Sequence, residues 1–184
     1  MKVLVIAGSL RKGSFNRKLA KLAAEVLRTR GHEVDELDLH QVAMPIYDGD
    51  LESASGLPEG AKAFRARIAA SRAIYLASPE YNNSVPGGMK NAVDWASRGA
   101  DQPFKGKVIA LSGASAGAYG TTRALSAWRA IFRLVDAFVI PSELALPFAS
   151  KAFTAEDQLV EERPKKQLEN VLDELVRVAT ALTT

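Results

Sequence analysis

Short apolar runs alternate with longer amphipathic stretches along the whole chain. The apolar runs predict strands at 3–7, 34–39, 73–77, 107–112 and 138–140. The amphipathic stretches predict helices at 16–30, 59–71, 85–98 and 121–135, and from residue 154 onward. Strand 34–39 alternates apolar and acidic residues, as an edge strand does. The stretch 40–60 contains Pro and Gly and is predicted to be a long surface connection.

Five strands separated by helices predict a doubly wound parallel sheet with helices on both faces, because parallel strands need crossover connections. We predict one α/β domain over residues 1–184, with strand order 2-1-3-4-5. In such sheets a ligand binds beyond the carboxyl ends of the strands, where the strand order reverses. The loops that start at Gly8 and Ser78 should therefore face each other across one crevice.

The composition excludes several classes of function. The chain has no cysteine, so thiol catalysis, thiolate metal sites and disulfides are excluded, and any redox chemistry needs a cofactor. Its net charge of +3 is modest and no Lys/Arg block is present, so no nucleic-acid partner is expected. The first apolar run ends at Gly8, which is too short for a signal peptide or a membrane span. We expect a cytoplasmic protein with no membrane partner.

The loop after the first strand, GSLRKGSFN at 8–16, concentrates groups that bind anions. Two hydroxyls, an amide and a guanidinium gather where a helix begins, and the free N–H groups there favour a phosphate. The loop is neither G-x-G-x-x-G nor a G-K-[ST] loop, which favours a monophosphate. The alternative is an ordinary loop in which Asn16 is the helix N-cap.

The loop after the third strand, SPEYNNSVPGG at 78–88, is rich in turn formers and polar groups. Backbone donors and acceptors beside the Tyr81 ring suit a planar heterocycle edged with N–H and C=O groups. The alternative is a strand-to-helix loop capped by Asn83 or Ser84. Four apolar residues that follow are predicted to be core: Met89, Ala92, Val93 and Trp95.

Together, GSLRKGSFN and PEYNNSVPGGMKNAVDW resemble the two motifs of the NAD(P)H-dependent FMN reductase family, which includes chromate and quinone reductases. The resemblance covers about 2–133 and implies a flavodoxin-like fold. It implies an enzyme that binds FMN and passes electrons from NADPH or NADH to a small-molecule acceptor such as a quinone, chromate or free flavin. Hydride would pass through flavin N5 in a ping-pong cycle, so we assign no catalytic residue.

The resemblance also implies the cofactor-binding residues. The FMN phosphate would be bound by Ser9, Arg11, Ser14, Phe15 and Asn16. The isoalloxazine would lie along Pro79, Glu80, Tyr81 and Asn82, and a glycine-rich loop after the fourth strand would add Ser115 and Gly117. In that loop Gly120 is followed by Thr121, where the family has a double glycine. We expect Glu80 to fix the backbone rather than to act as a base.

Other polar residues are assigned no chemistry. His32 and His40 are expected at the surface, away from the crevice. Asp48, Asp50 and Glu52 lie in one loop, where carboxylates are usually solvated, and we predict no metal site.

Family members are dimers or tetramers with the flavin near a subunit boundary, so a homo-oligomer is expected. Trp128, Ile131 and Phe132 exceed what one core face needs, although Trp128 is equally compatible with the core. Arg129 and Glu143 fall where related reductases make intersubunit contacts.

Two other functions share the fold: an electron-carrier flavodoxin and a flavin-binding protein without turnover. Flavodoxins have an acidic surface and a T-G-N-T-type phosphate loop, whereas this chain is basic and has Arg11 in that loop.

Overall fold

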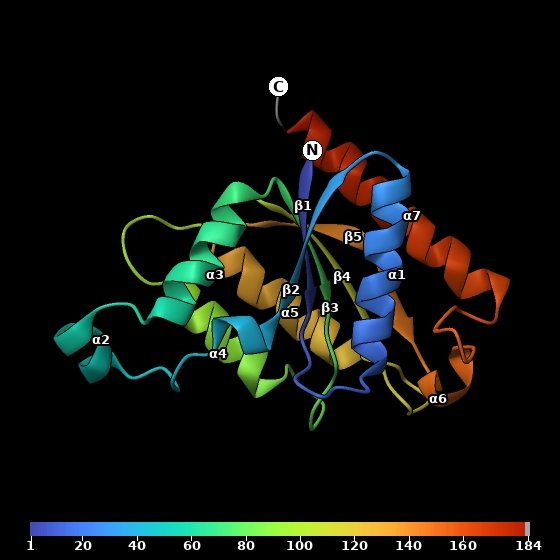
Figure 1. Cartoon of the computed structure of the whole chain (residues 1–184), viewed down its shortest axis with the longest axis horizontal. Coiled ribbons are helices and arrows are strands. Elements are labelled where there is room, and N and C mark those ends of the chain that lie inside the picture. Colours follow the sequence, from blue (N-terminus) through green and yellow to red (C-terminus); the bar gives the residue numbers. More distant parts are fainter. Residues whose placement is uncertain (183–184) are drawn as a thin grey trace.

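Five parallel strands in the order β2-β1-β3-β4-β5 form the centre of the computed structural model, as the sequence predicted (Figure 1). The strands are β1 (Lys2–Ala7), β2 (Glu33–Asp38), β3 (Ala73–Ala77), β4 (Val108–Ala114) and β5 (Phe138–Leu146). The structure describes residues 1–182. The last two residues of the predicted domain, 183–184, lie outside the described residues.

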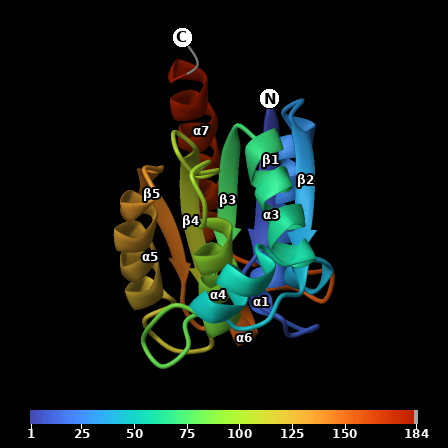
Figure 2. The same ribbon diagram turned by 90° about the vertical axis from the view of Figure 1, so that its left-hand side faces the viewer.

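Helices cover both faces of the sheet (Figures 1 and 2). One face carries α1 (Phe15–Thr29) and α7 (Glu162–Ala181), and the other carries α3 (Glu59–Ala70), α4 (Gly87–Ala96) and α5 (Thr122–Leu134). This arrangement confirms the predicted doubly wound α/β class.

Each face of the sheet has its own apolar core. Along β1, Val3 and Val5 pack toward α1 and α7, whereas Leu4 and Ile6 pack toward α3, α4 and α5. Successive strand residues point to opposite faces, so a strand buried on both faces is a continuous apolar run rather than an alternating one. The four residues after the third loop that were predicted as core, Met89, Ala92, Val93 and Trp95, are all buried.

The stretch 40–60 is more ordered than the predicted surface connection. It contains a 3₁₀ turn, η1 (Leu39–Val42), and a short helix, α2 (Gly49–Ser55), which projects from the body of the protein in Figure 1. Helix α2 has no buried residue, so no apolar periodicity marks it in the sequence. Its start is defined by Asp48, whose carboxylate accepts hydrogen bonds from the N–H groups of Asp50 (2.8 Å) and Leu51 (3.4 Å).

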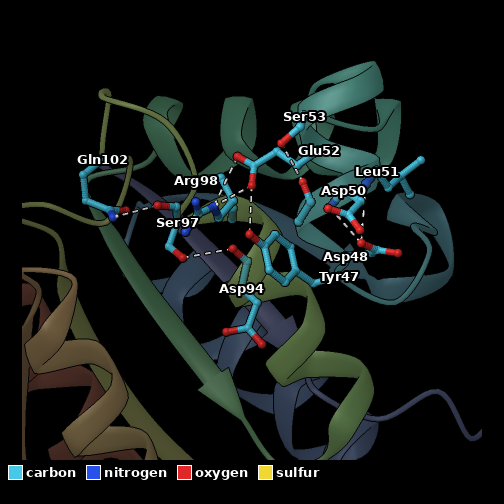
Figure 3. A network of polar contacts seen from close by, with 12 residues as sticks. Tyr47, Asp48, Asp50, Leu51, Glu52, Ser53, Asp94, Ser97, Arg98 and Gln102 are labelled. Atoms are coloured by element: carbon cyan, nitrogen blue, oxygen red, sulfur yellow. Dashed lines mark hydrogen bonds and ion pairs between the residues drawn. The ribbon is translucent and has the colours of Figure 1, made fainter.

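Polar contacts attach α2 to the segment that follows α4 (Figure 3). The Tyr47 hydroxyl donates to Glu52 at 2.9 Å, and Arg98 pairs with the same carboxylate at 2.9 Å. The Arg98 guanidinium also lies over the Tyr47 ring, 5.4 Å from its centroid. Glu52 and Asp48 therefore hold this part of the chain in place through their hydrogen bonds and ion pair.

Strand β5 is nine residues long, whereas the sequence predicted three. The β4–β5 register shifts around Pro141, which has no N–H to donate and is tolerated in an irregular edge strand. The Arg129 guanidinium donates to the carbonyls of Ile140 (2.8 Å) and Pro141 (2.9 Å) and to Glu143 (2.6 Å). Arg129 and Glu143 thus pair within one chain and cover the strand edge, a role the sequence analysis did not anticipate.

Trp128 belongs to the core, which was one of the two alternatives left open by the sequence, and it therefore gives no support to an interface. Its side chain is fully buried, stacks on Phe132 with 5.2 Å between ring centroids, and donates from Nε1 to the Ser78 hydroxyl at 2.7 Å. Ile131 is half-buried and packs against the same core.

The C-terminal helix begins later than predicted. Residues 153–161 form a turn with a bridge between Phe153 and Leu159, preceded by the short helix α6 (Ala149–Ala152), and α7 starts only at Glu162. The predicted amphipathic character of this helix is confirmed, since Leu168, Leu172 and Leu175 are buried. Within residues 1–182 no helix is long and apolar enough to cross a membrane.

We predict that Gly60→Ala destabilises the protein although alanine normally favours a helix. A Cβ at position 60 would lie 2.2 Å from the Ala43 carbonyl oxygen and 2.8 Å from that of Val42, so α3 and the 42–43 backbone must separate. We expect the free energy of unfolding of the Gly60→Ala variant to fall by about 1–3 kcal/mol, the usual effect of adding a methyl group to a site with no room for it. Urea denaturation measures this. Gly49→Ala is the matched control: its Cβ would have no neighbour closer than 3.8 Å, so stability should be unchanged or slightly increased.

Candidate functional site

The carboxyl ends of β1, β3 and β4 are joined by backbone hydrogen bonds at the lower edge of the sheet in Figure 1. Gly8 donates its N–H to the carbonyl of Ala77 at 2.8 Å, and Ser78 donates to that of Ser112 at 2.7 Å. The loops that follow these strands are thereby held side by side. We call them the first loop (8–14), the third loop (78–86) and the fourth loop (115–121).

Asn16 ties the start of α1 to the end of β4. Its side-chain amide donates to the Ala114 carbonyl and its carbonyl oxygen accepts from the Ala114 N–H, both at 2.9 Å. The N-cap of α1 is Ser14, whose hydroxyl accepts from the Asn16 N–H at 3.1 Å. The alternative in which Asn16 is the N-cap is therefore wrong, and the Asn16 side chain positions the loop with both its polar atoms already bonded.

The first loop has hydrogen-bond donors with no acceptor in the described part of the chain. The N–H groups of residues 12–15 have no acceptor within residues 1–182, and the Arg11 side chain is exposed without an ion-pair partner there. Arg17 is different, because it pairs with Asp38 through two bonds of 2.7 and 2.8 Å. Those bonds hold the pKa of the Asp38 carboxyl below its usual value. Four consecutive free N–H groups at a helix start, with a guanidinium beside them, fit a phosphate.

The third loop turns through a two-residue hairpin at Asn82 and Asn83. Tyr81 and Ser84 exchange backbone hydrogen bonds of 3.1 Å, and both asparagines have positive φ, 50° and 61°. Two consecutive positive φ values are the requirement of a type I′ turn, and Asn is among the residues that tolerate them. The turn leaves the Tyr81 ring 46% exposed, with its hydroxyl 3.4 Å from the Ser9 hydroxyl. Helix α4 has no side-chain cap, so Asn83 and Ser84 do not cap it.

Glu80 caps helix α5. Its carboxylate accepts from the N–H groups of Arg123 at 2.9 Å and Ala124 at 3.0 Å, the first turn of a helix that has no other side-chain cap. A carboxylate at a helix N-terminus also complements the helix dipole. Glu80 therefore fixes the backbone, as the sequence analysis expected, and Pro79 beside it is buried.

The fourth loop lies close against the third. A Cβ on Gly113, at the end of β4, would lie 2.0 Å from the Thr121 hydroxyl and 2.3 Å from the Ser78 carbonyl, so only glycine fits. The Ser115 hydroxyl accepts from the Gly117 N–H at 3.1 Å, and Gly117 is exposed. The backbone here is accessible to a flat ligand lying on the loop.

The predicted ligands lie in the three loops and at the start of α1, but not all of them are free to bind, because the side chains of Asn16 and Glu80 are bonded to backbone groups. The Phe15 ring stacks on Phe153, with centroids 6.1 Å apart, so its backbone N–H is the group that remains for a ligand. His40 lies closer than expected, with Nε2 3.0 Å from the Leu10 carbonyl oxygen. The pairing of β1 with β2 accounts for this contact, because it places the residues after the two strands side by side. Within residues 1–182 no cluster of side chains suited to a metal is present.

Comparison with known proteins gives consistent results. The family model for NADPH-dependent FMN reductases matches residues 1–151. The NAD(P)H-dependent FMN reductase of Pseudomonas aeruginosa is 37% identical over 95% of this chain and 93% of its own length. The quinone reductase of Escherichia coli K12 is 38% identical over 76% of this chain and 73% of its own length.

The solved structures include a related fold over almost the full length. The flavoenzyme FerB, an NAD(P)H:(acceptor) oxidoreductase from Paracoccus denitrificans, superposes with a TM-score of 0.85 at 32% identity, covering 98% of this chain and 97% of its own. The predicted flavodoxin-like fold, the oxidoreductase class and the use of FMN with NAD(P)H are thereby confirmed at the level of the family. The chain belongs to the NADPH-dependent FMN reductase family.

Proposed function

We propose that this protein is an NAD(P)H-dependent FMN oxidoreductase that reduces quinones, with chromate and free flavin as further candidate acceptors. The observation that carries the proposal is the set of free N–H groups at 12–15 beside Arg11, which suits a single phosphate next to the exposed Tyr81 ring. The whole of 1–184 is proposed to be one domain. Because the nicotinamide coenzymes are intracellular, the cytoplasm is the proposed compartment.

The protein's own part in the reaction is to bind and orient. When bound, FMN supplies a ring nitrogen that accepts and then delivers hydride. In our proposal Ser9, Arg11 and the N–H groups of 12–15 hold the phosphate, while Tyr81, Asn82 and the backbone at 115–117 support the ring. One open face then serves the coenzyme and the acceptor in turn, which corresponds to a ping-pong order.

Charge around the three loops distinguishes this proposal from an electron carrier. Arg11 and Lys12 lie in the first loop and Arg123 lies beside the third, where its guanidinium donates to Asn83 at 3.1 Å. A positive rim attracts an anionic coenzyme. Steady-state oxidation of NADPH with a quinone separates the alternatives, since a carrier or a non-catalytic flavin-binding protein would give no sustained turnover.

We predict that the purified protein is yellow and releases FMN. The first loop offers donors for one phosphate and lacks the glycine pattern of a pyrophosphate site. Chromatography of the cofactor after heat release identifies it. Release of FAD, or failure of the apoprotein to take up FMN on reconstitution, would contradict the proposal.

We predict that Arg11→Ala weakens FMN binding about tenfold to a hundredfold, the effect of losing one charge-assisted hydrogen bond. Stability of the apoprotein should change by less than about 0.5 kcal/mol, because the Arg11 side chain is exposed and has no polar partner in the described part of the chain. Fluorescence titration and urea denaturation measure the two quantities.

Asn16→Ala is the matched comparison in the same loop. It leaves the N–H and carbonyl of buried Ala114 without their partners, at about 1–3 kcal/mol each, so both stability and FMN affinity should fall. If Arg11→Ala lowers stability as much as Asn16→Ala does, Arg11 is structural and the phosphate assignment is wrong.

We also propose a homo-oligomer, either a dimer or a tetramer. Within one chain the predicted flavin surface is open, since Arg11, Tyr81 and Gly117 are all exposed. Large apolar side chains are exposed elsewhere, including Ile46 at 85% and Leu134 at 85%. A second copy would exclude water from such surfaces.

Light scattering at micromolar concentration tests the oligomer. We expect at least twice the mass of one chain, and Ile46→Asp or Leu134→Asp should lower the mass if that side chain lies in an interface. The mass of a single chain for the unmodified protein would exclude the oligomer at that concentration.

A further inference from the structure

A cavity of about 490 Å³ lies beyond the open edge of β5, between the end of that strand, α6 and the start of α7. We call it the β5 cavity. Figure 1 shows the two helices that contribute to its lining, α6 and α7, on the right-hand side. Its volume falls within the roughly 300–1,000 Å³ of small-molecule sites. It lies at the carboxyl edge of the sheet, where α/β proteins bind their ligands.

The lining of the β5 cavity combines an apolar wall with two cations. Phe148, Pro147 and Pro164 supply apolar surface, and Lys151 and Arg163 supply positive charge. Both cations are exposed, and neither has an ion-pair or hydrogen-bond partner for its side chain within residues 1–182. By contrast, every cation of α1 is ion-paired, for example Lys18 with Asp157 at 2.5 Å. Free cations beside apolar surface suit an anion that carries a flat ring.

Two local features support a ligand rather than a random hollow. Phe148 has φ 46° and is 55% exposed, so a bulky side chain is held in a strained left-handed conformation facing solvent. Helix α7, which is 20 residues long, begins at the cavity without a side-chain cap. Its free N–H groups and dipole add to the attraction for an anion.

The segment that begins at the β5 cavity is hydrogen-bonded to the fourth loop, which belongs to the predicted flavin surface. Phe148 donates its N–H to the Gly117 carbonyl at 3.1 Å, and Ala149 donates to the Ser115 carbonyl at 2.9 Å. Phe148, which lines the cavity, therefore contacts the fourth loop directly. A long ligand with a reactive ring at one end and an anionic ring system at the other could occupy both.

We propose that the β5 cavity binds the phosphate-bearing adenosine end of the nicotinamide coenzyme, with Phe148 against the purine and Lys151 and Arg163 at the 2′-phosphate. This inference rests on the proposed function and extends it, because it makes the protein selective for NADPH over NADH. An arginine near the ribose is a recurring way of accepting the 2′-phosphate. Glu161, the carboxylate among the lining residues, opposes that phosphate and limits its affinity.

Calorimetric titration of the FMN-loaded protein with 2′,5′-ADP and with 5′-AMP tests the site without turnover. We expect 2′,5′-ADP to bind more tightly. Arg163→Ala and Lys151→Ala should each raise its dissociation constant about fivefold to tenfold and leave that of 5′-AMP nearly unchanged. Glu161→Gln should lower it severalfold, an opposite sign that a merely structural role would not produce. Lys105→Ala is the matched control and should have no effect, because Lys105 is exposed and lies just before β4, near the amino ends of the strands.

Steady-state kinetics should show the same selectivity. The KM for NADPH should rise in the Arg163 and Lys151 variants, while the KM for NADH and kcat stay constant. Phe148→Gly should weaken both coenzymes and give a melting temperature no lower than that of the unmodified protein, because glycine relieves the positive φ.

Three results would overturn the assignment. One is equal binding of 2′,5′-ADP to all the variants, and another is no binding at all. The third is salicylate, an aromatic anion, binding at these residues without competing with NADPH, which would make the cavity a site for free effectors. The outcome is separable from the proposed function. A protein that oxidises NADH with bound FMN but ignores these substitutions keeps its function and loses this site.

Discussion

The functional surface depends on one constraint of the parallel sheet: strands that run the same way end at the same edge. With β1, β3 and β4 adjacent, the residues after each strand must meet, and the bond from Gly8 to Ala77 fixes how closely. Crossover helices then have to start at that edge, so their unbonded N–H groups face the same place. A surface rich in backbone donors is therefore a consequence of the topology, and the loop sequences determine which ligand suits it.

Some side chains in this surface hold the loops in place, and others remain available to a ligand. Asn16 and Glu80 are occupied with backbone groups of Ala114 and α5, so they hold the loops in place. Arg11 and the N–H groups of 12–15 remain available. A preorganised set of donors binds an anion without first breaking protein hydrogen bonds, which is how a protein contributes orientation and charge to chemistry that its cofactor carries out.

The sequence was sufficient for the strand order and for both loop motifs, because buried parallel strands are continuous apolar runs and the motif residues are local. The sequence was insufficient where contacts between distant residues determine the structure. Helix α2 has no buried face to create a pattern, and the length of β5 follows from its pairing with β4 on both sides of a register shift. Trp128 could not be assigned from composition, since only the packed structure reveals its contact with Ser78. The hydrogen bonds of Asn16 with Ala114, 98 residues away in the sequence, could not be predicted either.

The central claim is that the backbone of 12–15 binds the phosphate of FMN. Amide chemical shifts of the ¹⁵N-labelled apoprotein, followed during titration with FMN and then with riboflavin, test it most directly. We predict that FMN shifts the amides of 12–15 and of the third loop, whereas riboflavin, which has the same ring but no phosphate, shifts only the third and fourth loops. Equal shifts at 12–15 with both ligands, or none with FMN, would contradict the account.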